Sequence, residues 1–224
     1  MRFDIISIFP ESFESYFNAS ILKRAQQTGL IQCVTHELRD FAHDKHQTTD
    51  DTPYGGGPGM VMKIEPIARA VQTIQANEQT LKTRRILLSA KGKLFTQKDA
   101  QRLVSYDRLI LICGRYEGVD ERVVTHVVDE EISIGAYVLT GGELPAMVLV
   151  DSIARLVPGV LGNSESASSE SYSDGRTLEY PQYTKPETYE GWSVPPVLLS
   201  GNHQDIANWR ESEAQKTTEK NSSE

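Results

Sequence analysis

The chain has 224 residues, of which 38% are hydrophobic and 24% are charged, and its formal net charge is −8. This composition is ordinary for a globular protein, and no apolar run approaches the roughly 18 residues of a membrane span. The acidic balance argues against nucleic-acid binding through overall charge, although basic residues gathered in the first 85 positions leave room for a local basic face. Two cysteines cannot build a disulfide framework, so we expect a reducing, cytoplasmic location.

Strands and helices alternate along the first two thirds of the chain, as judged from apolar runs, helical spacing and turn residues. In chain order the patterns predict a strand at 2–9, a helix at 12–28, a strand at 30–38, a helix at 64–77, a strand at 84–90, a helix at 97–104, a strand at 108–114, a short helix at 119–126, an extended segment at 131–139 and a helix at 142–156. Strands that are apolar on both faces predict an α/β fold, with a mainly parallel sheet and helices on both faces.

The composition changes after this alternating region, which we delimit as a domain of residues 1–161. Residues 162–175, "GNSESASSESYSDG", are rich in serine and nearly devoid of apolar side chains, which predicts a flexible linker or lid. Residues 176–224 form a small, mainly helical C-terminal unit. Its helix begins near Ser200 or Asn202, and we expect its polar tail to fray.

The stretch from Asp50 to Met60, "DDTPYGGGPGM", raises the question of why so much glycine is gathered there. Because ordered glycine loses much backbone entropy, the stretch is either a flexible linker or a fixed loop whose backbone approaches a ligand. No Lys-Ser or Lys-Thr follows it, and no G-x-G-x-x-G follows a strand. Neither a phosphate loop nor a classical dinucleotide site is therefore indicated.

Three glycine-bearing turns follow predicted strands, at 87–93, 113–122 and 133–146. Ligands of open parallel sheets bind outside the carboxyl ends of the strands, so these turns are candidates for one site. Backbone groups could bind a purine edge there, while Arg115 and Glu117 supply one charge of each sign. An adenosyl group with a charged amino-acid tail fits this mixture. The alternative is tight turns between packed elements, with Glu117 and Arg122 as a surface ion pair.

Five segments together resemble the bacterial tRNA guanine-N(1)-methyltransferase family, in the family's order and spacing over about residues 1–210. They are "DKHQTTDDTPYGGGPGM", "CGRYEGVDERV", "SIGAYVLTGGELPAMVLVDSIARLVPGVLGN", "YPQYTKP" and "VPPVLLSGNH". The resemblance implies methyl transfer from S-adenosylmethionine to N1 of the guanosine at tRNA position 37. It also implies a deep trefoil knot of the SPOUT class and a homodimer with an active site shared between subunits.

The resemblance also assigns residues to the cofactor and the substrate. The positions that match the family's cofactor site are Leu88, Ser89, Gly114, Glu117, Ile134, Gly135, Ala136, Tyr137, Val138, Leu139, Gly141 and Gly142. The glycine-rich loop becomes a wall of the guanine site, and the implied substrate residues are Asp51, Tyr54, Gly56, Gly57, Pro58, Gly59 and Tyr116. Glycine would there let the backbone approach a flipped base.

Two residues are implied to carry the reaction, Glu170 in the linker and Arg155 at the end of the long helix. Guanine N1 carries a proton, so a base must remove it as the methyl group arrives, and a cation would stabilise the charge that builds on the guanine oxygen. The family has an aspartate before a Ser-aromatic pair, whereas this chain has Glu170 before Ser171 and Tyr172. Asp174 is the rival base.

Two other departures from the family pattern bear on affinity. Ala136 stands where the family commonly has aspartate, and the chain ends soon after Arg210, where the family often continues into a further basic segment. These changes keep two alternatives open: a related methyltransferase acting on another RNA position, such as a ribose hydroxyl, and a binding protein that has lost catalysis.

The segment "FAHDKHQTTDD" could be misread as a metal site, but it lacks the closely arranged set of three ligands that is typical of catalytic zinc. We therefore predict no metal ligands. Magnesium is suggested by the resemblance alone. Several tyrosines could stack on RNA bases: Tyr54, Tyr116, Tyr172, Tyr180 and Tyr183.

Overall fold

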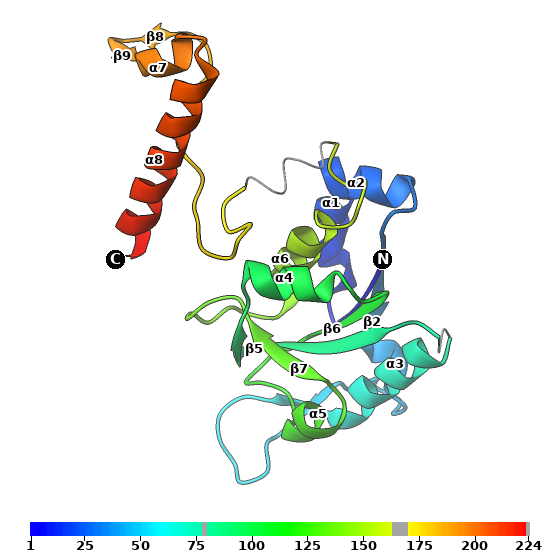
Figure 1. The fold of residues 1–224 in the computed structure, drawn as a ribbon. Helices are drawn as coiled ribbons and strands as arrows, with labels where there is room; N and C mark the ends of the chain where they lie inside the picture. The colour runs from blue at the N-terminus through cyan, green and yellow to red at the C-terminus, as the bar shows by residue number, and fades with distance from the viewer. Residues whose placement is uncertain (78–79, 163–169, 223–224) are drawn as a thin grey trace. The chain divides into compact units, whose positions relative to one another are not determined.

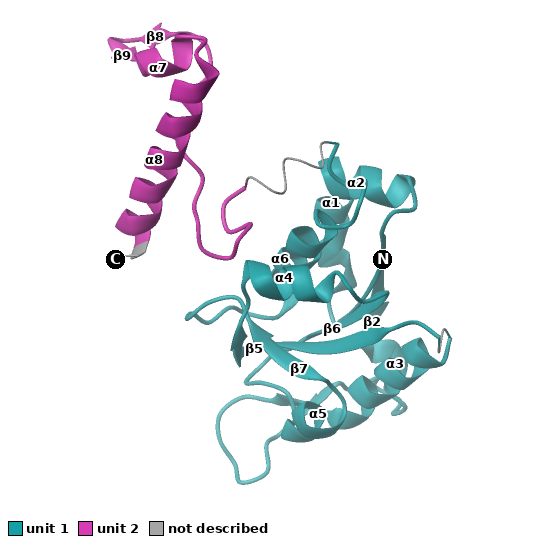
Figure 2. Ribbon diagram, viewed as in Figure 1, with its two compact units in different colours: residues 1–162 teal, residues 163–224 magenta. Residues whose placement is uncertain are grey.

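The computed structural model describes residues 1–77, 80–162 and 170–222. The chain divides into two compact units, residues 1–162 and 163–224, drawn in teal and magenta in Figure 2. Among the described residues, no helix combines the length and the hydrophobicity needed to cross a membrane.

The first unit is built on a five-stranded sheet in which every neighbouring pair is parallel, with strand order β2-β1-β6-β5-β7 (Figure 1). Its strands are β1 (Arg2–Ser7), β2 (Gln32–Glu37), β5 (Thr83–Leu94), β6 (Arg108–Cys113) and β7 (Glu130–Ser133). The central strand β6 is buried at every position, as its unbroken apolar run requires. The prediction of a mainly parallel sheet is confirmed.

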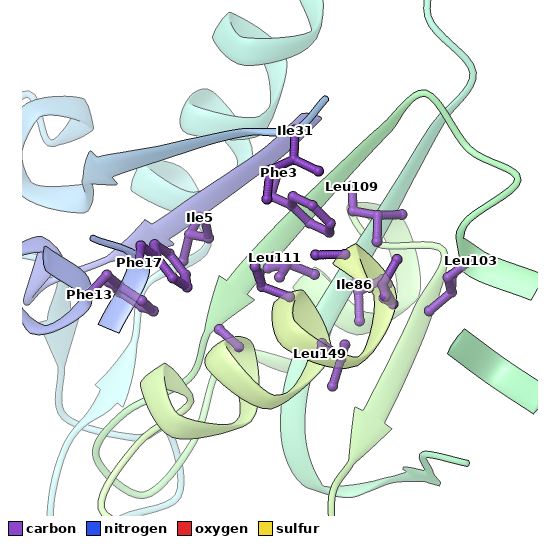
Figure 3. Close-up of a cluster of buried hydrophobic side chains, with 14 of the residues drawn as sticks. Phe3, Ile5, Phe13, Phe17, Ile31, Ile86, Leu103, Leu109, Leu111 and Leu149 are labelled. Carbon is purple, nitrogen blue, oxygen red and sulfur yellow. The ribbon is translucent and has the colours of Figure 1, made fainter. Parts of the chain in front are cut away.

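Helices cover both faces of this sheet. One face carries η1 (Pro10–Phe13), α1 (Glu14–Phe17), α2 (Ser20–Gln27), α4 (Gln97–Leu103) and α6 (Glu143–Ala154). The other carries η2 (Leu38–Phe41), α3 (Ile64–Ala76) and α5 (Glu121–His126). Figure 3 shows the core of the first face, where Phe3 and Leu111 from the sheet meet Phe13, Phe17 and Leu149 from the helices.

The predicted helix over 12–28 is wrong, because it is interrupted after Phe17. Ser20 adopts a positive φ of 44°, and α2 starts there. On one continuous helix of about 3.6 residues per turn, Phe13 and Phe17 would face away from Leu22. The interruption lets all three side chains enter the same core, where the rings of Phe13 and Phe17 stack with centroids 5.4 Å apart.

Two segments near the ends of strands also differ from expectation. Strand β5 continues to Leu94, but Leu88 and Lys93 both pair with Ile132, so the four residues between them leave the ladder. Strand β7 ends at Ser133, and the predicted extended run to 139 is wrong beyond it. The side chain of Ser133 instead bonds Gly135, and the chain turns.

The second unit contains a short hairpin and two helices: β8 (Thr188–Tyr189), β9 (Trp192–Ser193), α7 (Pro196–Leu199) and α8 (His203–Ser222). Asn202 caps α8 by accepting the backbone N–H of Gln204 at 3.1 Å. The polar tail, which the composition predicted to fray, is helical through Ser222. The Thr218 hydroxyl accepts a hydrogen bond from the N–H of Leu178 at 2.9 Å. This bond connects the last turns of α8 to the segment that precedes the hairpin.

A buried charged cluster closes the amino end of the sheet. Asp4 and Arg108 are fully buried, with Arg108 Nε 3.3 Å from Asp4 Oδ2. Arg2 Nε and His36 Nε2 lie 2.8 Å from the same carboxylate. Burial alone would raise the pKa of Asp4, but the hydrogen bonds from His36 and Arg2 outweigh it and leave the pKa lowered.

Asp4→Asn is expected to destabilise the first unit by about 3–5 kcal/mol, because it removes the buried carboxylate that pairs with the buried Arg108 guanidinium. Since the folded-state pKa of Asp4 is lowered, its stabilisation is present above the unfolded pKa of about 3.9 and is lost as pH falls through the folded value. Denaturant titration measures the change. Asp120→Asn is the matched control, since Asp120 pairs with the exposed Arg122 and should cost under about 1 kcal/mol. Equal losses would contradict the role of Asp4.

Candidate functional site

A cavity of about 200 Å³ lies at the carboxyl ends of β5, β6 and β7, which are neighbours in the sheet. The predicted cofactor residues in its wall are Leu88, Ser89, Gly114, Glu117, Ile134, Gly135, Tyr137, Val138, Leu139, Gly141 and Gly142. Ala136 is exposed and is not part of the wall. The three glycine-bearing turns therefore do converge, because parallel neighbours end at the same edge.

Glycines allow the loops around this cavity to touch. The N–H of Gly142 bonds the carbonyl of Gly114 at 2.8 Å. A Cβ atom on Gly142 would lie 2.7 Å from the Cα of Cys113, and one on Gly114 would lie 3.1 Å from the carbonyl oxygen of Leu88. The close approach that glycine permits is thus used to pack β5 at Leu88, the turn after β6 and the loop before α6 against one another.

Glu117 presents a carboxylate at the cavity. Its side chain is exposed and has no hydrogen-bond partner within the described ranges. Its backbone N–H bonds the carbonyl of Met60 at 3.0 Å, and Tyr116 before it has a positive φ of 59°. Such a conformation is strained for a bulky residue and is typical of functional turns. The turn thereby places the Glu117 side chain at the cavity.

The glycine-rich stretch is a loop with fixed ends. Its ends are joined by the antiparallel pair β3 (Asp50–Asp51) and β4 (Val61–Met62). In β4, the backbone N–H of Met62 bonds the carbonyl of Gly118, and the carbonyl of Met62 accepts the N–H of Asp120. The loop base therefore lies directly beside the turn that carries Glu117.

The glycines of this loop fall into two kinds. Gly55, Gly56 and Gly57 contact nothing within 4 Å where a Cβ would stand, and their positive φ values of 86°, 78° and 129° are what require glycine. A Cβ on Gly59 would lie 2.4 Å from Cγ of Glu117. Tyr54 is fully exposed. Among the glycines of this loop, all of which the structure describes, only Gly59 lies against another side chain.

Arg115 lines the cavity but is not an unpaired charge there. Its Nε lies 3.0 Å from Oε2 of Glu143, a buried carboxylate that sequence reasoning missed. The proposed Glu117–Arg122 ion pair is wrong, because Arg122 pairs with Asp120 at 2.7 Å. Glu143 directly follows the paired glycines in "TGGELPA", but only the folded structure brings it to Arg115.

The two residues implied to be catalytic belong to different units. Arg155 is half-buried and ends α6, where its N–H bonds the carbonyl of Asp151. Glu170 is the first described residue after 163–169, so part of the predicted linker lies outside the described residues. Glu170 is half-buried, and its carbonyl accepts the N–H of Ser173 at 3.1 Å.

The carboxylate of Asp174, the rival base, is hydrogen-bonded within its own turn. It accepts hydrogen bonds from the Thr177 hydroxyl at 2.6 Å and from the backbone N–H groups of Thr177 and Arg176. The bond from the Thr177 hydroxyl is the largest cause that lowers the pKa of Asp174 to about 2. A carboxylate of such low basicity is a poor general base near neutral pH, which favours Glu170.

The remaining candidates have local partners. Asp44, in the segment considered for metal, accepts bonds from the backbone of His46 and Thr48 and from the Thr48 hydroxyl. Within the described ranges, no three His, Cys, Asp or Glu side chains gather as a metal-binding group. Of the tyrosines considered for stacking, Tyr183 packs near Trp209 with ring centroids 6.3 Å apart, and Arg210 lies over the ring of Tyr180.

Comparisons with known proteins all point to one family. The model of the family described as "tRNA (Guanine-1)-methyltransferase TrmD" matches residues 1–224. A tRNA (guanine-N(1)-)-methyltransferase of Dictyoglomus turgidum is 56% identical over 218 residues, which cover 97% of this chain and 86% of that protein. Similarly named proteins of Geobacter sp. and Chloroflexus aggregans are 54% and 56% identical over the same length, and 86% and 84% of those proteins are covered. The chain therefore belongs to the tRNA (guanine-1)-methyltransferase family.

Proposed function

We propose that this chain transfers a methyl group from S-adenosylmethionine to N1 of the guanosine at tRNA position 37. The reaction type, methyl transfer to guanine N1 of a tRNA, follows from membership of the family. The observation that supports it in the structure is the convergence of the predicted cofactor residues on one cavity, directly beside the glycine-rich loop. The target position follows from the family resemblance.

The cavity suits a nucleoside with a charged tail. Gly114 and Gly142 let the loops of the wall pack closely against one another, and these loops can present backbone groups to a purine edge. The unpartnered carboxylate of Glu117 suits the ammonium group of the methionine part. When bound, S-adenosylmethionine supplies an activated sulfonium methyl group, so the transfer itself needs no metal.

The protein's own part in the reaction is to hold the guanine and to move its proton. Glu170 accepts the N1 proton, and Arg155 stabilises the negative charge that builds on the guanine oxygen. The fixed ends of the glycine-rich loop hold the loop as a wall of the guanine site. The position of Asp174 in its own turn supports Glu170 as the base.

The proposed assembly is a homodimer with an active site shared between subunits. A group of exposed apolar side chains on α6, on α1 and on the loop before α6 supports it: Tyr16, Tyr137, Val138, Leu144 and Val148. Monomeric proteins rarely leave such patches uncovered. The deep knot, a magnesium requirement and a cytoplasmic location belong to the same proposal.

Methyl transfer from labelled S-adenosylmethionine to two tRNA transcripts tests the function. We expect label on the transcript with guanosine at position 37 and none on the transcript with adenosine there. Label on both would contradict the target base and favour a methyltransferase acting elsewhere on the RNA, for example at a ribose. Label on neither, with folded protein and bound cofactor, would contradict the activity and favour a binding protein.

A further inference from the structure

Two arginines share one aromatic ring just outside the methyl-donor cavity. The guanidinium carbons of Arg115 and Arg39 lie 4.6 Å and 5.9 Å from the centroid of the Phe9 ring. Phe9 follows β1, Arg39 lies in η2 directly after β2, and Arg115 follows β6. Because β2, β1 and β6 are parallel neighbours, these residues meet at the same carboxyl edge of the sheet. We call them the Phe9 arginine pair.

Each arginine of the pair is held on one edge by a carboxylate. Oε2 of Glu143 accepts a hydrogen bond from Nε of Arg115 at 3.0 Å, and Oε1 of Glu143 accepts a hydrogen bond from the hydroxyl of Ser7 at 2.7 Å. Glu143 and Ser7 are buried, so Glu143 is a positioning residue for Arg115. Arg39 donates through one terminal nitrogen to the carbonyl of Ile8 and to Glu37.

The other edge of each guanidinium remains open. Over the residues that the structure describes, the terminal nitrogens of Arg115 have no hydrogen-bond partner, and the same holds for Nε and the second terminal nitrogen of Arg39. Both side chains are partly exposed. Two oriented guanidinium groups stacked on one ring are suited to phosphate, because their planar forks match its oxygens better than an ammonium group does.

The location of the pair identifies which phosphate it can meet. The N–H of Arg115 contacts Sδ of Met62, at the base of the glycine-rich loop. Arg115 lies in the cavity wall, whereas Arg39 does not, so the pair extends out of the cavity toward the loop. We propose that the Phe9 arginine pair binds the RNA backbone beside the methylated base, at one phosphate or at two neighbouring phosphates. This inference rests on the proposed function, since it assumes an RNA substrate.

The salt dependence of RNA binding tests the pair. Affinity for a tRNA transcript is measured at several salt concentrations for the full chain and for Arg39→Gln, Arg115→Gln and the variant with both changes. We expect Arg39→Gln to weaken binding roughly tenfold. The slope of log affinity against log salt should become less negative by about 0.7 in the double variant if the arginines share one phosphate, and by about 1.4 if each holds its own.

Controls separate this outcome from others. Lys98→Gln removes one positive charge from the exposed side of α4, on the opposite face of the sheet from η2, and should leave the slope nearly unchanged. The dissociation constant of S-adenosylmethionine should not change in Arg39→Gln, because Arg39 does not line the cavity. An unchanged salt slope in Arg39→Gln and in the double variant would overturn the inference, and so would a loss of cofactor affinity in place of RNA affinity. Arg39 is partly exposed and, within the described part of the chain, has no buried partner carboxylate, so its variant should fold even if changes at Arg115 disturb Glu143.

The result can also be told apart from a failure of the proposed function. The binding measurement needs no turnover, and the wild-type chain is assayed for methyl transfer on the same transcript. Methyl transfer with an unchanged slope would reject the Phe9 arginine pair alone. No methyl transfer, with binding that loses its salt dependence in the variants, would reject the enzyme activity and keep the pair.

Discussion

Glu170→Gln is expected to lower kcat by about 10²–10⁴-fold, because an amide cannot take the N1 proton of guanine. The dissociation constant of S-adenosylmethionine should stay unchanged, since the proposed role begins only when the base is bound. Single-turnover methyl transfer measures the first quantity, and calorimetric titration with the cofactor measures the second. Glu170→Asp should retain most of the activity, because it keeps a carboxylate one methylene shorter, as in the family's usual pattern.

The matched control for this prediction is Asp174→Asn. Asparagine can still accept the hydrogen bonds from Thr177 and Arg176 through its amide oxygen, so the turn should persist. We expect turnover close to that of the wild type. A large loss in Asp174→Asn together with an active Glu170→Gln would exchange the two assignments. A strong loss of cofactor binding in Glu170→Gln would contradict the proposed role of Glu170.

Gly142→Ala is expected to weaken cofactor binding. Its new methyl group would stand 2.7 Å from the Cα of Cys113 and 2.9 Å from the N of Gly114, and both are backbone atoms that cannot rotate away. Relieving the clash must separate two loops of the cavity wall and lengthen the bond between Gly142 and Gly114. Overpacking of this kind costs about 1–3 kcal/mol, which corresponds to a roughly 5- to 150-fold loss of affinity if it falls on the bound state.

Gly162→Ala provides the comparison for that experiment. A Cβ on Gly162 would meet nothing within 4 Å, and its backbone does not need a positive φ. The same substitution there should change neither cofactor affinity nor the melting temperature appreciably. Normal S-adenosylmethionine binding by Gly142→Ala would show that the cavity is assigned to the wrong ligand.

Much of the site could be predicted because it follows from strand order and turn composition. Leu88, Gly114 and Gly142 come directly after apolar runs or before a helix, and the rule for parallel sheets places such turns at one edge. Periodicity fails where tertiary packing decides the conformation. The interruption at Ser20 is set by the need of Phe17 and Leu22 to enter one core, and no local signal in the sequence marks it.

Long-range polar contacts were the other part that the sequence could not reveal. Ser7 and Glu143 are separated by 136 positions, yet they share a hydrogen bond. Each is ordinary in its local context, one at the end of a strand and one in the first turn of a helix. Their partnership depends on how β1 and α6 pack, which periodicity does not specify. The same holds for the four residues of β5 that leave the ladder beside Ile132.

The fixed ends of the glycine-rich loop have a consequence for the entropy of binding. Because β3 and β4 close the loop in the folded chain, the cost of bringing its ends together is met during folding. What remains to be ordered when RNA arrives is the tip around Gly55, Gly56 and Gly57, where no side-chain rotamers are lost. Ordering these three glycines costs backbone entropy but no side-chain entropy, and the shortness of the tip limits the total cost of adapting to a base. Lengthening the tip should therefore weaken RNA binding only gradually, whereas breaking the pairing of Asp51 with Val61 should weaken it at once.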